Sequence, residues 1–138
     1  MVVNRTLVIL KPDAVERGLI GEILGRFERR GLKVAAAELR IVSKDVAKLH
    51  YAEHTERPFF GDLVAFITRS AALVMVVEGP TDTWKIVRAM IGTTNPADAA
   101  PGTIRGDYAT DLAENLIHGS DGPEAAAREV ALFFPGLA

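Results

Sequence analysis

A histidine that follows a short apolar segment is the first residue of this chain with clear chemical potential. Leu116 and Ile117 precede His118, and Gly119 follows it. This pattern is typical of a short buried strand that turns toward a helix. Such a corner fixes the backbone of the histidine and leaves its side chain open on one side. We therefore consider His118 a candidate reacting group.

A carboxylate further along the chain is spaced to return to this histidine. Ala126, Val130 and Phe133 form an apolar stripe at helical spacing, and Glu129 lies beside that stripe. We expect Glu129 to reach back to the imidazole of His118 at the helix entrance. A carboxylate partner determines which ring nitrogen carries the proton and leaves the other nitrogen as an acceptor.

Other polar residues fall in predicted loops or off the apolar stripes of predicted helices. Three cations with several hydroxyl and amide groups around one imidazole would suit a polyanion, because the arginine donor fork matches phosphate oxygens. Phosphoryl transfer depends mainly on positioning and charge neutralisation, so these side chains would be sufficient for it. The residues concerned are Lys11, Tyr51, His54, Arg88, Thr94, Arg105 and Asn115.

One common metal-binding motif occurs in the sequence, and two common nucleotide-binding motifs do not. The sequence contains no Walker A motif and no G-x-G-x-x-G turn. Residues 50–54 spell H-x-x-E-H, the inverted zinc-protease pattern. That pattern is short and no third ligand is marked, so a polar surface is the commoner explanation for His50 and His54. A Mg²⁺ ion is better expected to arrive with a nucleotide.

Composition sets broad limits on the protein. The 138 residues are enough for one compact domain, and the formal net charge of −2 provides no overall attraction for nucleic acid. The chain has no cysteine, which excludes disulfides and thiolate metal sites. Its N-terminal apolar segment stops at Lys11, too early for a signal peptide, and no segment is long enough for a membrane span. We expect a cytoplasmic protein.

The periodicity of apolar residues predicts the elements that position these side chains. Their order is β-α-β-α(α)-β-α-β-α, which corresponds to a ferredoxin-like split βαβ fold of the α+β class. We expect a four-stranded antiparallel sheet with two crossover helices on one face, and a helical hairpin and the last helix on the other. Residues 92–105, rich in Gly, Thr, Asn and Pro, are expected to form a long functional loop. The predicted strands are 6–10, 33–42, 72–77 and the segment at 116–117.

Several sequence blocks together resemble one enzyme family. The most specific is Asn115-x-x-His118-Gly119-Ser120-Asp121, and the chain resembles nucleoside diphosphate kinases from end to end. Further blocks match in the same order: Lys11-Pro12-Asp13, Arg57-Pro58-Phe59-Phe60, Asn95-Pro96 and the segment 101–107. The whole chain, residues 1–138, is accordingly expected to be a single domain of this kind.

The resemblance implies a ping-pong transfer of the terminal phosphoryl group from a nucleoside triphosphate to a nucleoside diphosphate through a phosphohistidine on His118. It implies that Glu129 orients His118 and that Phe59 stacks on the base, a contact every base can make. Leu63 and Leu112 would line the base site, and Asp121 would contact Mg²⁺ through water. Phosphates and sugar would be surrounded by Lys11, Tyr51, Arg88, Thr94, Arg105 and Asn115.

The resemblance also implies a homo-oligomer. The chain ends soon after Phe134, without the extended tail of longer family members. Such tails contribute to subunit interfaces, so their absence bears on the subunit arrangement. The proline-containing loop is a further interface element in the family, and we expect a hexamer, with a tetramer as the alternative.

Two other classes of function could use the same fold or the same residues. A nucleic-acid module on a split βαβ sheet would need exposed aromatic residues on its strands and a basic face. The predicted strands are aliphatic instead, so nucleic-acid binding is not expected. A regulatory sensor that binds nucleotides without turnover would need the same binding residues, and only a turnover assay separates it from a kinase.

Overall fold

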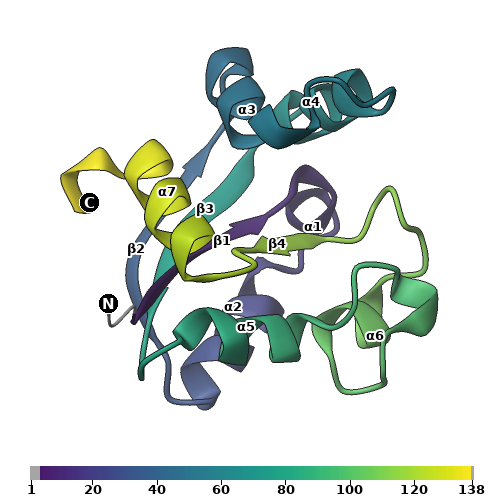
Figure 1. Ribbon diagram of the computed structural model, residues 1–138. Helices are drawn as coiled ribbons and strands as arrows, with labels where there is room; N and C mark the ends of the chain where they lie inside the picture. The colour runs from purple at the N-terminus through teal and green to yellow at the C-terminus, as the bar shows by residue number, and fades with distance from the viewer. Residues whose placement is uncertain (1–3, 138) are drawn as a thin grey trace.

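The computed structural model describes residues 4–137 and has helices on both faces of one sheet (Figure 1). Within these residues, no helix is both long and apolar enough to cross a lipid bilayer. Short 3₁₀ turns occupy Ala52–His54, Pro96–Asp98 and Pro135–Leu137. The strands are β1 (Arg5–Leu10), β2 (Lys33–Arg40), β3 (Ala72–Glu78) and β4 (Ile117–Gly119), and the helices are α1 (Pro12–Glu16), α2 (Ile20–Arg29), α3 (Lys44–His50), α4 (Phe60–Thr68), α5 (Thr83–Ile91), α6 (Ile104–Tyr108) and α7 (Pro123–Phe133).

The sheet has the order β2-β3-β1-β4, and each neighbouring pair is antiparallel. This confirms the predicted ferredoxin-like α+β fold with a four-stranded antiparallel sheet. Strands β1 and β3 are central and almost entirely buried, because both of their faces are covered. Their continuous apolar sequences are the reason that both were predicted within a residue or two.

Alternate residues of the central strands enter two separate cores. On one face, Val8 and Met75 pack with α1, α2, α5 and α6. On the other face, Leu7 and Val76 pack with α3, α4 and α7. The predicted division is therefore confirmed, with the crossover helices α2 and α5 on one face and the hairpin and last helix on the other.

Several local predictions were incomplete. The last strand was predicted at 116–117 with His118 after it, but β4 begins at Ile117 and contains His118. Helix α1 was not predicted, because five residues are too few to show a helical period; Pro12 occupies its first turn, where the missing N–H costs no hydrogen bond. The segment 92–105 was expected to be a loop throughout. It contains a 3₁₀ turn capped by Asn95, and it ends in α6, whose N-cap Thr103 accepts a hydrogen bond from Gly106 N–H.

Candidate active site

His118 lies in the middle of β4, at the edge of the sheet, and is hydrogen-bonded to a carboxylate. Its Nε2 is 2.8 Å from Glu129 Oε1, and its side chain is 22% exposed. The same Glu129 oxygen accepts a 2.8 Å hydrogen bond from the hydroxyl of Ser120. With a proton on Nε2, the Nδ1 nitrogen of His118 retains its lone pair. The spacing argument from the sequence thus placed Glu129 correctly beside His118.

Glu129 is buried, although the sequence placed it only beside the apolar stripe of its helix. Its residue exposure is 4%. Burial alone would raise the pKa of this carboxyl, but hydrogen bonding and charge interaction with His118 outweigh burial, and the pKa is lowered. Glu129 is therefore an anion near neutral pH and holds the ring of His118 in one orientation.

The chain enters β4 through a strained residue. Leu116 is fully buried and has φ of 74°, the left-handed region that a leucine rarely adopts. Its N–H donates to the buried carboxylate of Asp13, and its carbonyl accepts from the N–H of Lys11. The segment that follows the first strand therefore fixes the backbone two residues before His118.

Gly119 allows α5 to approach β4 closely. A Cβ atom at this position would lie 2.8 Å from Ile91 Cδ1, too close for an unshifted neighbour. The close approach brings Arg88 of α5 to β4, where its guanidinium donates a 3.2 Å hydrogen bond to the carbonyl of Gly119. Arg88 thus lies beside the histidine strand, as the sequence predicted for a residue off the apolar stripe.

Lys11, Asn115 and Thr94 form a hydrogen-bonded chain at the ends of β1 and β4. The amine of Lys11 donates to Asn115 Oδ1 at 3.0 Å, and the amide of Asn115 donates to the carbonyl of Thr94 at 3.0 Å. Burial, reinforced by the charge of Arg105, lowers the pKa of Lys11 to about 8. The lysine still carries its charge near pH 7.

Arg105 is buried and serves the backbone. Only 3% of the residue is exposed, and its guanidinium donates to the carbonyls of Gly92, Asn115 and Ile117. Burial and the neighbouring charge of Arg88 lower its pKa to about 10. These contacts fasten both ends of the 92–105 segment to the strand that carries His118, a structural role that the sequence did not indicate.

The protein has several open hollows, each of about 470 Å³ or more. The largest of those described has a volume of about 890 Å³ and is lined by six of the predicted site residues. Its walls also include Asp62, Phe66, Arg69, Asp111 and Glu114, which the sequence analysis did not single out. Two apolar side chains stand exposed at this hollow, Phe59 at 43% and Leu112 at 57%. The predicted residues that line it are Lys11, Phe59, Leu63, Thr94, Leu112 and Asn115.

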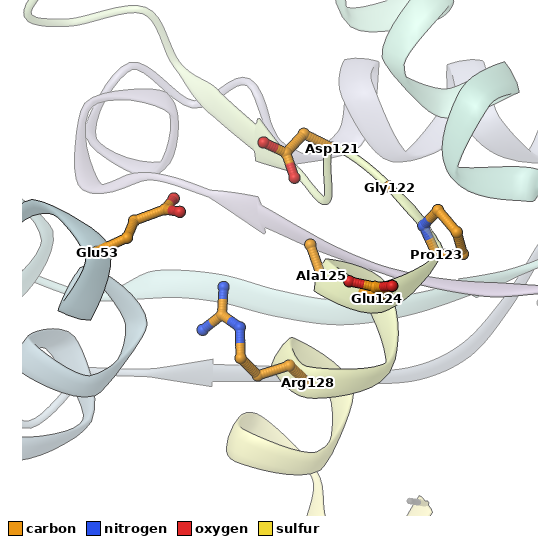
Figure 2. A pocket seen from close by; sticks show the side chains of 7 residues that line it. All are labelled: Glu53, Asp121, Gly122, Pro123, Glu124, Ala125 and Arg128. Carbon is orange, nitrogen blue, oxygen red and sulfur yellow. The ribbon is translucent and has the colours of Figure 1, made fainter.

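Asp121 lies in a different hollow, of about 470 Å³. Figure 2 shows its carboxylate together with Glu53 and Arg128, each pointing into the space between them. Arg128 also lies 3.5 Å from Glu129 Oε2. Asp121 is therefore an exposed carboxylate, three residues after His118, outside the larger hollow.

The expectation that His50 belongs to a polar surface was wrong. His50 is 4% exposed and lies behind His118, with the two ring centroids 4.7 Å apart. The next residue, Tyr51, packs edge-on against His50, and burial followed by the charge of Glu129 raises its pKa to about 12. Tyr51 thus presents a neutral phenol. A helix end gives no sequence signal for this burial, which depends on the distant α7.

The inverted zinc-protease motif does not form the ligand set that its sequence suggests. His54 faces Glu53 at 3.6 Å and is more than a third exposed, whereas His50 points to Glu129. Within residues 4–137, the group of three potential metal ligands is His50, His118 and Glu129. The four described strands carry no Phe, Tyr or Trp, so the prediction of aliphatic strands is confirmed.

A split βαβ fold that presents a histidine–carboxylate pair beside cationic side chains is suited to phosphoryl transfer. Comparison with known proteins gives the family. The family model described as nucleoside diphosphate kinase matches residues 4–137. This chain therefore belongs to the nucleoside diphosphate kinase family, and it is an enzyme of phosphoryl transfer between nucleotides.

Individual relatives agree over nearly the full length. A nucleoside diphosphate kinase of Parafrankia sp. is 54% identical over 137 residues, which cover 99% of each chain. The crystal structure of a nucleoside diphosphate kinase family protein from Babesia bovis is 47% identical, with a TM-score of 0.94 over 98% of this chain and 90% of that one. The halophilic enzyme of Halobacterium salinarum, in complex with CDP, is 52% identical, with a TM-score of 0.91 over 94% of this chain and 86% of that one.

Proposed function

We propose that the enzyme transfers phosphoryl groups by a ping-pong mechanism with a phosphohistidine on His118. The observation that carries the proposal is the 2.8 Å hydrogen bond between His118 Nε2 and the buried, ionised Glu129. This bond fixes the tautomer in which Nδ1 is the free nucleophile. The hydroxyl of Ser120 donates to the same Glu129 oxygen, so the pair is positioned before a nucleotide binds.

In the first half-reaction, the Nδ1 lone pair attacks the terminal phosphorus of a nucleoside triphosphate. A nitrogen–phosphorus bond forms, the bond to the bridging oxygen breaks, and the nucleoside diphosphate leaves with that oxygen. The imidazole gains positive charge, which the Glu129 carboxylate stabilises. A second nucleoside diphosphate then attacks the phosphohistidine with a terminal oxygen, and the same steps run in reverse to regenerate His118.

Cationic and polar side chains would neutralise and hold the phosphates. Lys11 and Arg88 provide charge near the two ends of β4, and the remaining guanidinium donors of Arg105 add to it. Tyr51 and Asn115 would donate hydrogen bonds to phosphate oxygens or the sugar, and Thr94 lines the same hollow. The direct contacts of Arg105 to three carbonyls make it both a positioning residue and a source of positive charge.

The base would lie between apolar side chains of the large hollow. Phe59 offers a flat face for stacking, and Leu63 and Leu112 would contact the edges of the base. Stacking does not discriminate strongly between bases, because every base has a π-face. This arrangement supports a broad range of nucleotides as substrates.

The donor set fits a Mg²⁺ ion held mainly by the nucleotide. Mg²⁺ keeps several waters and takes one or two carboxylates together with phosphate oxygens. Asp121 is an exposed carboxylate close in sequence to His118 and would hold such an ion through water. When bound, the ion would offset negative charge on the phosphates. The side chains of the protein would orient the phosphorus toward Nδ1.

The remaining proposals concern the whole protein. We take residues 1–138 as a single catalytic domain that works in the cytoplasm, where nucleoside phosphates are its substrates. A homo-oligomer, a hexamer in preference to a tetramer, is proposed from the family relationship. Light scattering on the purified protein measures the subunit number directly, and a monodisperse monomer would contradict this part of the proposal.

Labelling tests the proposed intermediate. The protein is incubated with Mg²⁺ and ATP labelled at the γ-phosphate, and unlabelled GDP is then added. We expect an acid-labile, alkali-stable label on the protein that moves to GTP. His118→Ala should abolish the label while the circular dichroism spectrum is retained. His54→Ala, which changes a partly exposed histidine that faces Glu53 rather than Glu129, should keep the label. Label on folded His118→Ala protein would refute the assignment.

A further inference from the structure

A second imidazole faces the carboxylate that orients His118. The Nδ1 atom of His50 lies 4.0 Å from Glu129 Oε2 and has no hydrogen-bond partner, and only 2% of its side chain is exposed. Buried polar atoms are nearly always paired, so an unpaired imidazole nitrogen that points at a carboxylate needs an explanation. The proposed phosphoryl transfer does not use this nitrogen.

His50 and Glu129 are in the protonation states that metal ligands need, although burial and the nearby cations Lys11 and Arg128 oppose any added positive charge. Burial, followed by the proximity of His118, lowers the pKa of His50 to about 3, so its ring is neutral near pH 7. Glu129 has a lowered pKa and is an anion. A metal ion requires neutral imidazoles and an ionised carboxylate. Both conditions hold at His50 and Glu129 without the loss of a proton.

We propose that His50, His118 and Glu129 form a binding site for Zn²⁺ or a similar transition-metal ion. One ligand atom from each residue can be chosen so that all three lie within 4.8 Å of one another. A shared ion needs distances of about 2.0–2.2 Å, which modest side-chain rotations would provide. Two imidazoles and one carboxylate are a known zinc set, with a fourth position left for water. Mg²⁺ prefers oxygen ligands and would compete weakly.

Metal binding and phosphoryl transfer would exclude each other. The ion would replace the proton that His118 Nε2 shares with Glu129, and that proton would leave to solvent. Glu129 could then no longer stabilise the positive charge that develops on the ring. His118 is 22% exposed and forms the accessible side of the group, so an ion would enter from that side. Zinc would therefore act as a reversible inhibitor at the nucleophile.

Direct binding tests the site without nucleotide. Metal-free protein is titrated with Zn²⁺ against a chromophoric chelator, and with Co²⁺ as a probe whose visible spectrum reports tetrahedral nitrogen and oxygen ligands. We expect one ion per chain. His50→Gln should lower the Zn²⁺ affinity at least about 100-fold, since loss of even an outer-shell partner costs 10–100-fold. His54→Gln removes the other histidine of the H-x-x-E-H motif and should leave the affinity unchanged.

Three outcomes would overturn the proposal. They are equal Zn²⁺ affinity in the wild type and His50→Gln, loss of affinity in His54→Gln, and a Co²⁺ spectrum of octahedral type. If His50→Gln does not fold, Glu129→Gln replaces it and must weaken binding to a similar extent; undiminished binding would refute the site. Labelling of His118 in zinc-free Mg²⁺ buffer is a separate measurement, so failure of the zinc site and failure of the phosphohistidine are distinguishable.

Discussion

The two ends of the active site are built differently. At the His118 end, the functional groups are largely buried and each is held by hydrogen bonds: Glu129 is 4% exposed and Arg105 is 3% exposed. In the large hollow, which Lys11 and Asn115 line but His118 does not, Phe59 is 43% exposed and Leu112 is 57% exposed. The first end is fixed by directional bonds, and the second offers mainly apolar surface.

This difference separates chemistry from recognition. A nucleophile must be held within a fraction of an ångström, which buried hydrogen bonds achieve at the cost of desolvating charges. A base needs only a flat apolar surface if the enzyme accepts many bases. Mutations at the His118 end should therefore affect the rate or the fold strongly, and mutations at the Phe59 end should affect mainly substrate affinity.

The largest effect is expected for Glu129→Gln. The amide cannot stabilise positive charge on His118, and it can present a donor where an acceptor is needed, so kcat should fall by roughly 10²–10³-fold with little change in KM. Steady-state kinetics with varied ATP and a fixed second nucleotide provide the measurement. Glu124→Gln, on the exposed first turn of α7, is the matched control and should stay near the wild-type rate. A similar kcat in both variants would contradict the proposed role of Glu129 in catalysis.

Arg105→Ala should destabilise the fold as well as slow transfer. Its removal leaves the carbonyls of Gly92, Asn115 and Ile117 without their donor, which should lower the free energy of unfolding by about 2–4 kcal/mol. Urea denaturation measures this change. Arg17→Ala removes an exposed arginine that donates to one carbonyl, and it should cost less than about 1 kcal/mol. An equal loss in the free energy of unfolding for both variants would show that the three hydrogen bonds of buried Arg105 stabilise the fold no more than the single bond of Arg17.

His50 should make the protein less stable in mild acid. Its pKa is about 3 in the folded state, and the usual value in the unfolded chain is about 6.5. Between these values the unfolded state binds the additional proton, so stability falls as pH falls, by up to about 1.4 kcal/mol per pH unit. Above about pH 6.5 the ring of His50 is neutral in both the folded and the unfolded state, so it no longer makes stability depend on pH.

Denaturation of wild type and His50→Gln at several values between pH 6.5 and 5 measures this slope. The variant should show a flatter dependence on pH, whatever its stability at pH 7. The groups that share this environment, Lys11, His118, Arg128 and Glu129, are present in both proteins. Parallel curves would contradict a neutral, buried His50.

The smallest effects are expected at the exposed end. Phe59→Ala removes the stacking surface and should raise KM for all nucleotides by roughly 10-fold, with kcat nearly unchanged, as stacking contributes about 1–3 kcal/mol per base. Leu112→Ala should have a weaker effect of the same kind. Leu49→Ala changes a leucine of similar exposure, 58%, outside this hollow and serves as the control. A large fall in kcat for Phe59→Ala would show that base contacts also position the phosphate.

Much of the fold was predictable from local patterns. The apolar segments of β1 and β3 and the helical spacing from Ile20 to Phe27 depend on residues close together in sequence, and all were confirmed. The position of Glu129 relative to His118 was also predictable, because only eleven residues and one helix entrance separate them. Helix α1 was missed because a single turn and a half has no detectable period.

By itself, the sequence determined which chemical groups are available, the order of the strands and helices along the chain, and the pairing of His118 with Glu129. Tertiary structure decided the burial of His50, the hydrogen bonds of Arg105 to carbonyls, and the left-handed backbone of Leu116, which Asp13 holds from 103 residues away. The physical reason is that burial and long-range hydrogen bonds depend on the packing of distant elements. No local period or composition encodes those contacts.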